Sequence, residues 1–291
     1  MDQIDNIFKA AHLGQQIWSS TDPVQRANAL EKIASALEEN RAELLSLCSR
    51  EAGKTLKDCH DEIREAVDFC RYYALCGRND FKEAGIKLAG PTGESNIYKL
   101  QARGIFVCIS PWNFPIAIFT GQIVAALMAG NAVIAKPAEQ VSLTGAFIAK
   151  LMHQAGIPPE VLSFCPGDGR IGAALVEHEN VGGVAFTGST EVANNINRAL
   201  AAKEGAIPRL IAETGGQNAM IVDSSALTEQ VVDDVIQSAF GSAGQRCSAC
   251  RVLYLQEEIA DKTINMLTGA VVALRVGNPR YISTDIGPLI D

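Results

Sequence analysis

Between Gly104 and Ala212 the chain alternates short apolar segments with longer segments of helical spacing, and this alternation restricts the possible folds. The predicted strands cover residues 105–109, 132–135, 161–164, 183–186 and 210–212, and the predicted helices lie near residues 115–129, 142–155, 169–178 and 190–202. Strands that are apolar on both faces and alternate with helices form a parallel sheet covered on both sides. We therefore predict a doubly wound α/β domain, which binds ligands at the carboxyl ends of its strands.

The residues before this region are predicted to be helical up to about residue 80. Asp22 and Pro23 start one helix, because Asp is a good N-cap and Pro suits the first helical position. Further helices are predicted over residues 42–50, ending near Gly53, and over residues 57–75. Between residues 86 and 102, apolar residues flank a Gly-Pro-Thr-Gly turn, which is typical of a β-hairpin.

After Glu213 the pattern predicts only two more strands, over residues 219–222 and 252–255. It also predicts two helices, one with Thr228 as its N-cap and one over residues 259–274. Two strands are too few to close a second domain. We therefore divide the chain into a complete α/β domain, residues 1–212, and an incomplete second α/β domain, residues 213–291.

The composition excludes several classes of function. Apolar residues make up 47% and charged residues 20%, as in a folded globular protein. The net charge is −8 and no segment concentrates Lys and Arg, so we expect no nucleic-acid partner. The longest apolar run, residues 116–128, is too short to span a bilayer. Eight scattered cysteines without a secretory signal favour a cytoplasmic protein whose thiols, such as Cys108, are mostly buried.

One cysteine stands out by its surroundings. Cys247 lies in a predicted loop between a helix and a strand, next to Arg246 and small residues, where a thiol can gain thiolate character. Two other interpretations stay open, a half-buried structural thiol and a redox pair with Cys250, while a third, a metal site, is disfavoured. A zinc site needs a second pair of ligands at suitable spacing, which the sequence lacks, so we predict no metal.

Several separate motifs occur in a fixed order along the chain. They are Ser110-Pro111-Trp112-Asn113-Phe114-Pro115, Lys136-Pro137-Ala138-Glu139, Phe186-Thr187-Gly188-Ser189-Thr190-Glu191, Glu213-Thr214-Gly215-Gly216 and Gly244-Gln245-Arg246-Cys247. In these motifs, and in the interval between the last two, the chain resembles the aldehyde dehydrogenase superfamily over almost its whole length. The resemblance implies a Rossmann-like NAD-binding domain, residues 1–212 with its core at 104–212, followed by the start of the catalytic domain.

The resemblance also implies catalytic roles. Cys247 is the nucleophile, and its thiolate adds to an aldehyde carbon to give a thiohemiacetal. The side-chain amide of Asn113 and the backbone N–H of Cys247 stabilise the oxyanion. Glu213 is the general base that activates water to hydrolyse the thioester. A carboxylate in a nearly closed apolar site has a raised pKa, which suits a base, so we expect Glu213 to be enclosed.

NAD is the implied cofactor. The start of the predicted helix at residues 190–202 suits its pyrophosphate, because free backbone N–H groups gather there. The counterparts of Lys136 and Glu139 contact the adenosine ribose, and a carboxylate there repels a 2′-phosphate, which favours NAD over NADP. The full set of implied cofactor-binding residues is Ser110, Pro111, Trp112, Lys136, Glu139, Gly167, Gly188, Ser189, Glu213 and Gly215.

Within the superfamily, the chain is most similar to the L-glutamate γ-semialdehyde (1-pyrroline-5-carboxylate) dehydrogenase half of bifunctional proline utilisation A proteins. The likeness rests on the continuation of the Ser110 motif through residue 122, and on residues 193–197, 212–218 and 245–249. It implies a small aldehyde substrate bound in part by Arg246 and Ser248. The hairpin at 86–102 implies a homo-oligomer.

The chain also departs from the family, whose members continue well beyond this length and carry a second glutamate in an E-x-F-G-P segment that this sequence lacks. We therefore interpret it as a C-terminally truncated fragment. Two alternatives to the enzyme stay open: a non-catalytic NAD-binding fragment, and an aldehyde dehydrogenase of another substrate class.

Overall fold

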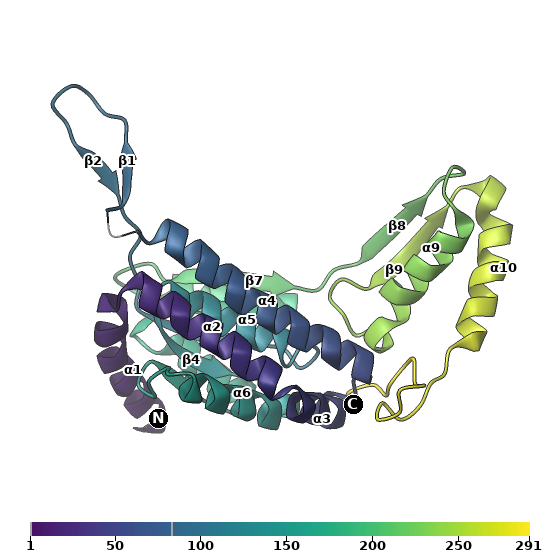
Figure 1. The fold of residues 1–291 in the computed structure, drawn as a ribbon, viewed down its shortest axis with the longest axis horizontal. Helices are drawn as coiled ribbons and strands as arrows, with labels where there is room; N and C mark the ends of the chain where they lie inside the picture. The colour runs from purple at the N-terminus through teal and green to yellow at the C-terminus, as the bar shows by residue number, and fades with distance from the viewer. Residues whose placement is uncertain (1, 83) are drawn as a thin grey trace.

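The computed structural model describes residues 2–82 and 84–291 (Figure 1). Its helices are α1 (Asp2–Ser20), α2 (Pro23–Glu39), α3 (Arg41–Ala52), α4 (Leu56–Asp80), α5 (Ala117–Met128), α6 (Ser142–Gln154), α7 (Gly169–Glu177), α8 (Thr190–Ala201), α9 (Thr228–Val235) and α10 (Glu257–Ala273). Its strands are β1 (Ile86–Leu88), β2 (Asn96–Tyr98), β3 (Ile105–Ile109), β4 (Ala132–Lys136), β5 (Leu162–Phe164), β6 (Val181–Gly188), β7 (Arg209–Thr214), β8 (Asn218–Val222) and β9 (Cys250–Leu255).

The largest sheet has the strand order β5-β4-β3-β6-β7, and each neighbouring pair is parallel. In the centre, Val107 of β3 lies between Ile134 of β4 and Val184 of β6. The chain starts in the middle of the sheet and extends first to one edge and then to the other. This topology confirms the predicted doubly wound α/β fold.

Side chains of β3 point alternately into two cores, one on each face of the sheet. Phe106 and Cys108 join the core formed with α2, α4, α5 and α6. Ile105 and Val107 join the core formed with α1, α7 and α8. Every residue of β4 is buried. Burial on both faces explains why β3 and the first four residues of β4 are apolar.

The N-terminal helices confirm the predicted helical region, but α4 runs five residues beyond the predicted end at Leu75, to Asp80. Contacts with other helices explain the extension. Arg78 donates hydrogen bonds to Glu31 and Asn28 of α2, at 2.7 and 2.8 Å. Gly77 packs so closely on α5 that a Cβ there would lie 2.3 Å from the Met128 side chain. Contacts with residues far away in the sequence do not change the local spacing of apolar residues, so that spacing did not indicate the longer helix.

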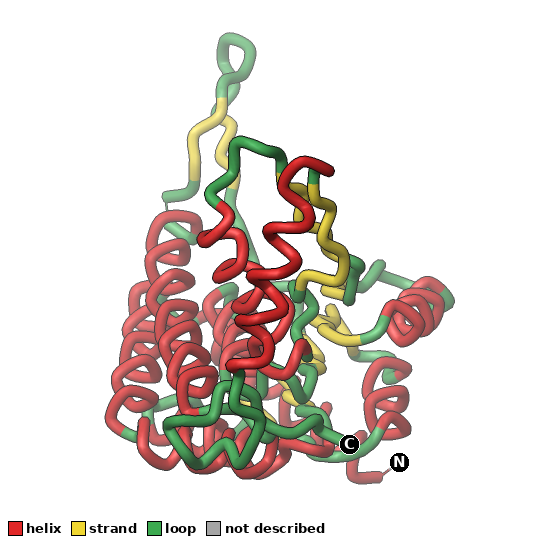
Figure 2. The backbone as a smooth tube through the Cα atoms, turned by 90° about the vertical axis from the view of Figure 1, so that its right-hand side faces the viewer, coloured by secondary structure: helices red, strands yellow, loops and turns green. Residues whose placement is uncertain are grey.

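The predicted hairpin is present, with β1 antiparallel to β2 and Ile86 opposite Tyr98. It projects from the body of the molecule, which Figure 2 also shows. Several of its apolar side chains are exposed, namely Ile86, Leu88, Ile97 and Tyr98. An exposed apolar hairpin has unpaired backbone edges that can recruit another strand.

Strands β8 and β9 form a separate parallel pair. Helices α9 and α10 pack on it around Val222, Val231 and Val235, while Ile221 and Tyr254 stay exposed. The predicted N-cap of α9 is wrong by one residue. Leu227 holds the N-cap position without a side-chain hydrogen bond, and the buried Thr228 is already helical.

Candidate active site

A cleft of about 490 Å³ opens where β3, β6 and β7 end. It brings together nine of the residues that the sequence marks as functional: Pro111, Trp112, Asn113, Gly188, Ser189, Glu213, Gly215, Arg246 and Cys247. The parallel sheet explains this convergence, because the carboxyl ends of its strands meet at one edge. The loop before β9 supplies the thiol from the other side.

Among residues 2–82 and 84–291, Cys247 is the one exposed cysteine. Of the other thiols, Cys48, Cys59, Cys70, Cys108 and Cys165 are buried, and Cys76 and Cys250 are half-buried. Burial raises the pKa of Cys70 and of Cys108 to about 12. Those two thiols stay protonated near neutral pH, so the chain offers Cys247 as its accessible nucleophile.

The backbone ahead of Cys247 adopts an unusual conformation. Ser242, Ala243 and Gly244 have φ values of 53°, 56° and 70°, so three successive residues are left-handed. For a residue with a side chain this conformation costs on the order of 1–3 kcal/mol, and it persists only where surrounding contacts enforce it. One such contact is the hydrogen bond from the backbone N–H of Gln245 to the Ser242 carbonyl, at 3.0 Å.

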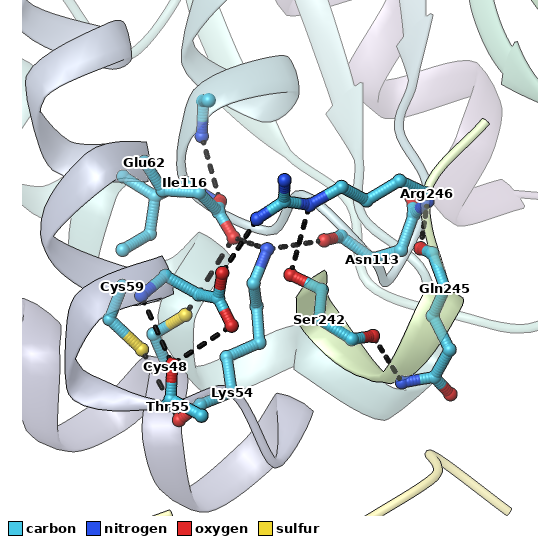
Figure 3. Close-up of polar contacts among 12 residues, drawn as sticks. Cys48, Lys54, Thr55, Cys59, Glu62, Asn113, Ile116, Ser242, Gln245 and Arg246 are labelled. Atoms are coloured by element: carbon cyan, nitrogen blue, oxygen red, sulfur yellow. Dashed lines mark hydrogen bonds and ion pairs between the residues drawn. The ribbon is translucent and has the colours of Figure 1, made fainter. Parts of the chain in front are cut away.

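Arg246 holds this turn from the side. Its Nη2 donates to Asp58 Oδ1 at 2.6 Å, and its Nε donates to the Ser242 hydroxyl at 3.2 Å (Figure 3). Asp58 is itself fixed by the Thr55 hydroxyl, which donates to its other carboxylate oxygen. The structure thus shows the Arg246 guanidinium in a structural ion pair at the cleft wall. Its predicted contact with substrate stays a prediction.

Asn113 reaches across the cleft to the same loop. Its Nδ2 donates to the Gln245 carbonyl at 2.8 Å, two residues before Cys247. A side-chain amide has two N–H donors, so this hydrogen bond uses only one of the two N–H groups of Asn113. From the other side, Asn218 Nδ2 donates to the Cys247 carbonyl at 2.7 Å and to the Ala249 carbonyl at 3.2 Å.

Glu213 lies near the end of β7, in register with Thr187 of β6. Its side chain is exposed. The expectation of an enclosed, apolar carboxylate is therefore wrong for the described residues. The reason is its position, because β7 is the edge strand of the sheet and four of its six residues are exposed. Ser248 is also exposed and does not line the cleft.

A second cavity, of about 360 Å³, adjoins the cleft and shares Thr187 with it. Ser110, Lys136 and Glu139 line it. Lys136 is buried and donates to the Gly167 carbonyl at 2.6 Å. Burial lowers the pKa of Lys136, and the Glu139 carboxylate opposes that shift. Both an ammonium group and a carboxylate therefore belong to the residues that line this cavity.

Two details suit a polar ligand in this cavity. The Ser110 hydroxyl is buried and has no hydrogen-bond partner within residues 2–82 and 84–291. Ser189 caps α8 by accepting the N–H of Val192 at 3.2 Å, and α8 begins beside the cavity. A Cβ at Gly167 would lie 2.6 Å from Ile171, and one at Gly188 would lie 2.6 Å from Phe186, so both positions require glycine.

Neither a metal site nor a membrane span is found in the described part of the chain. No group of three or more His, Cys, Asp or Glu side chains gathers there in a way that could bind a metal ion. No described helix combines the length and the apolar content that a bilayer crossing needs.

The comparisons with known proteins agree over the whole chain. The family model of the aldehyde dehydrogenase family matches residues 1–291. The bifunctional protein PutA of Klebsiella aerogenes is 54% identical, over 99% of this chain and 21% of that protein. The 1-pyrroline-5-carboxylate dehydrogenase of Anoxybacillus flavithermus is 37% identical, over 100% of this chain and 57% of that protein.

Solved structures give the same result. A mutant of proline utilization A from Bradyrhizobium japonicum matches with a TM-score of 0.97 at 56% identity, over 100% of this chain and 30% of that one. A 1-pyrroline-5-carboxylate dehydrogenase from Thermus, described with bound NAD, matches with a TM-score of 0.96 at 34% identity, over 100% and 57%. The chain spans less than two thirds of each of these relatives, and it belongs to the aldehyde dehydrogenase family.

Proposed function

We propose that this chain carries the nucleophile, base and cofactor site of an enzyme that oxidises L-glutamate γ-semialdehyde to L-glutamate with NAD. The observation that carries the proposal is the cleft in which Asn113, Glu213 and Cys247 converge. Relatives named 1-pyrroline-5-carboxylate dehydrogenase or PutA match this chain at 37% to 54% identity and support the substrate class. Its place in metabolism is then the second step of proline catabolism.

The first step is the attack of the Cys247 thiolate on the aldehyde carbon. A new C–S bond forms, and the carbonyl oxygen becomes an oxyanion of a thiohemiacetal. The proposed donors to that oxygen are the second N–H of the Asn113 amide and the backbone N–H of Cys247. Preorganised donors of this kind stabilise charge as it develops in the transition state.

The residues of the adjoining cavity fit NAD. The Ser110 hydroxyl, the Lys136 ammonium and the Glu139 carboxylate offer donors and an acceptor to ribose hydroxyls. The start of α8 at Ser189 suits a pyrophosphate, because helix N-termini attract anions. NAD held there would supply the acceptor for the hydride that leaves the thiohemiacetal carbon, and Cys247 would then carry a thioester.

Glu213 is the proposed base for the last step. It accepts a proton from a water molecule, which attacks the thioester carbon and breaks the C–S bond. The products are the carboxylic acid and the free thiol of Cys247. Glu213 and Cys247 line the same cleft, which is the geometry that this step requires.

The test uses an enzyme that contains these 291 residues and is as long as the relatives. We call it the extended enzyme. Glutamate semialdehyde and NAD should give NADH, followed by its absorbance, faster than aldehydes of similar size without an α-carboxylate. Equal rates for all of these aldehydes would make another substrate class the better account.

One observation favours a second candidate for the 291 residues by themselves, a non-catalytic NAD-binding unit. The cofactor cavity is built entirely from residues 109–199, whereas β8 and β9 leave Ile221 and Tyr254 exposed. Calorimetric titration with NAD, compared with NADH formation from the aldehyde, separates the two candidates.

A further inference from the structure

Two opposite charges are buried beside the cleft without lining it. Lys54 precedes α4, and Glu62 lies two turns into α4; their side chains are 5% and 2% exposed and form an ion pair. Removing charges from water costs several kcal/mol per ion unless the ions are paired and fully hydrogen-bonded. The other contacts of this pair therefore show what it holds in place.

Glu62 contacts the start of α5. Its Oε2 accepts the backbone N–H groups of Ile116 and Ala117, at 2.9 and 3.2 Å. The first N–H groups of a helix have no partner within the helix, and the N-terminal end carries a partial positive charge. A carboxylate on α4 thus caps α5 and fixes the position of its first turn.

Lys54 contacts the other end of the same segment. Its Nζ donates to the backbone carbonyl of Asn113 at 2.8 Å and lies 4.3 Å from the centre of the Phe114 ring. Lys54 and Glu62 are paired, so they hold residues 113 and 116–117 as one unit. Figure 3 shows this chain of contacts, from Ile116 through Glu62 and Lys54 to Asn113.

The segment that the pair holds has the sequence Asn-Phe-Pro-Ile-Ala, in which Asn113 is the only residue with a polar side chain. The amide of that residue donates to the Gln245 carbonyl in the loop that carries Cys247. Whatever fixes the backbone of this segment therefore fixes the distance between the Asn113 amide and the nucleophile.

We propose that Glu62 and Lys54 are positioning residues that hold the Asn113 amide in place for the oxyanion formed at Cys247. This inference rests on the proposed function, in which Asn113 supplies one of the two oxyanion donors. Neither residue touches the reacting atoms, and both act through the backbone of residues 113–117.

The test measures acylation of Cys247 by p-nitrophenyl acetate in the extended enzyme, followed as nitrophenolate release. This ester forms an oxyanion at the same thiol but needs neither NAD nor the natural aldehyde. We expect Glu62→Gln to slow acylation by about 10-fold or more, because small misplacements of catalytic groups are costly, while KM changes little.

Glu51 provides a matched control. Its carboxylate caps α6 in the same way, accepting the N–H groups of Leu143 and Thr144 at 2.9 and 2.6 Å. Helix α6 carries none of the residues assigned to the cleft or to the cofactor cavity. Glu51→Gln should therefore change the acylation rate by less than about 2-fold, the usual limit for independent sites.

A double-mutant cycle with Asn113→Ala separates positioning from a general loss of structure. If Glu62 acts through Asn113, Glu62→Gln should cost less than about 2-fold once the amide is gone. If the two losses multiply in full, the proposal is overturned. Normal acylation by Glu62→Gln would overturn it as well.

A further variant covers the case in which Glu62→Gln leaves Lys54 unpaired and prevents folding. Lys54→Met combined with Glu62→Leu removes both charges at similar volume, a change that buried ion pairs often tolerate. This variant should fold and acylate slowly, whereas acylation at the normal rate would refute the proposal. If acylation follows the expected pattern but glutamate semialdehyde gives no NADH, the substrate assignment fails and the positioning role stands.

Discussion

At the scale of single residues, the exposure of the thiols separates Cys247 from the other seven cysteines. We expect Cys247→Ser to abolish NADH formation in the extended enzyme, and Cys250→Ser to keep most of it, because Cys250 is half-buried and its Sγ contacts the Val252 carbonyl at 3.4 Å. Equal loss in both variants would favour a dithiol mechanism.

Iodoacetamide should label Cys247 first and leave Cys70 and Cys108 unlabelled, as mass spectrometry of the peptides can show.

Glu213 is expected to act after hydride transfer. Glu213→Gln should leave the first-turnover burst of NADH intact and lower steady turnover by about 10² or more, the usual scale for loss of a general base. Stopped-flow absorbance resolves the two phases. A burst that disappears together with turnover would assign Glu213 to an earlier step.

Glu139 is expected to set the cofactor preference. Its carboxylate lines the cavity beside the Lys136 ammonium, and it would repel the 2′-phosphate of NADP. Glu139→Gln should therefore raise the ratio of kcat/KM for NADP to that for NAD by about 10-fold, if one unscreened contact is worth about 1.4 kcal/mol. A wild-type enzyme that already prefers NADP would contradict this argument.

At the scale of elements, the left-handed turn at residues 242–244 makes a prediction about stability. Gly244 has a φ of 70°, and a Cβ there would lie 2.9 Å from the Ala239 carbonyl oxygen. Gly244→Ala should lower the free energy of unfolding by about 1–2 kcal/mol, because an L side chain disfavours this conformation. Urea unfolding measures the change.

Gly269 is the natural comparison, since it lies within α10 and a Cβ there would meet nothing within 4 Å. Gly269→Ala should raise the free energy of unfolding by about 0.5–1 kcal/mol, because glycine weakens helices. If both substitutions shift the unfolding midpoint in the same direction, the strain at the turn is not the cause.

The elements that were predicted well are those whose sequence pattern depends only on neighbouring residues. Strand β3 and residues 132–135 of β4 are buried on both faces and therefore form continuous apolar runs in the sequence. The end of α4 was predicted too early, because Arg78 and Gly77 are held by contacts with other helices, α2 and α5, and not by residues near them in the sequence. The N-cap of α9 was predicted one residue too late, because Leu227 holds that position and the buried Thr228 is already helical.

The same distinction applies to the cleft. Motifs around Asn113, Glu213 and Cys247 identified residues that the fold does bring together. The roles of Lys54 and Glu62 were not predicted, because the segment that they contact, residues 113–117, lies more than 50 residues away in the sequence. No local pattern marks either residue. The exposure of Glu213 could not be predicted either, since it depends on β7 being an edge strand.

At the scale of the whole molecule, the β1–β2 hairpin and the face of β8–β9 with Ile221 and Tyr254 are among the regions that expose apolar side chains. We expect the 291-residue chain by itself to self-associate and to bind NAD with little or no turnover of the aldehyde. Sedimentation velocity measures the association, and Ile97→Lys in the hairpin should weaken it. A monomeric chain with full activity would contradict the prediction.

Helix α4 joins two parts of the molecule that are far apart. It has 25 residues, so at about 1.5 Å per residue this helix is roughly 37 Å long. Near its first end, Glu62 accepts the N–H groups at the start of α5 and pairs with Lys54, which donates to the Asn113 carbonyl. Its other end, at Asp80, lies near the base of the hairpin (Figure 1). A partner strand that paired with the hairpin would therefore bind at the opposite end of α4 from the residues that hold the Asn113 segment.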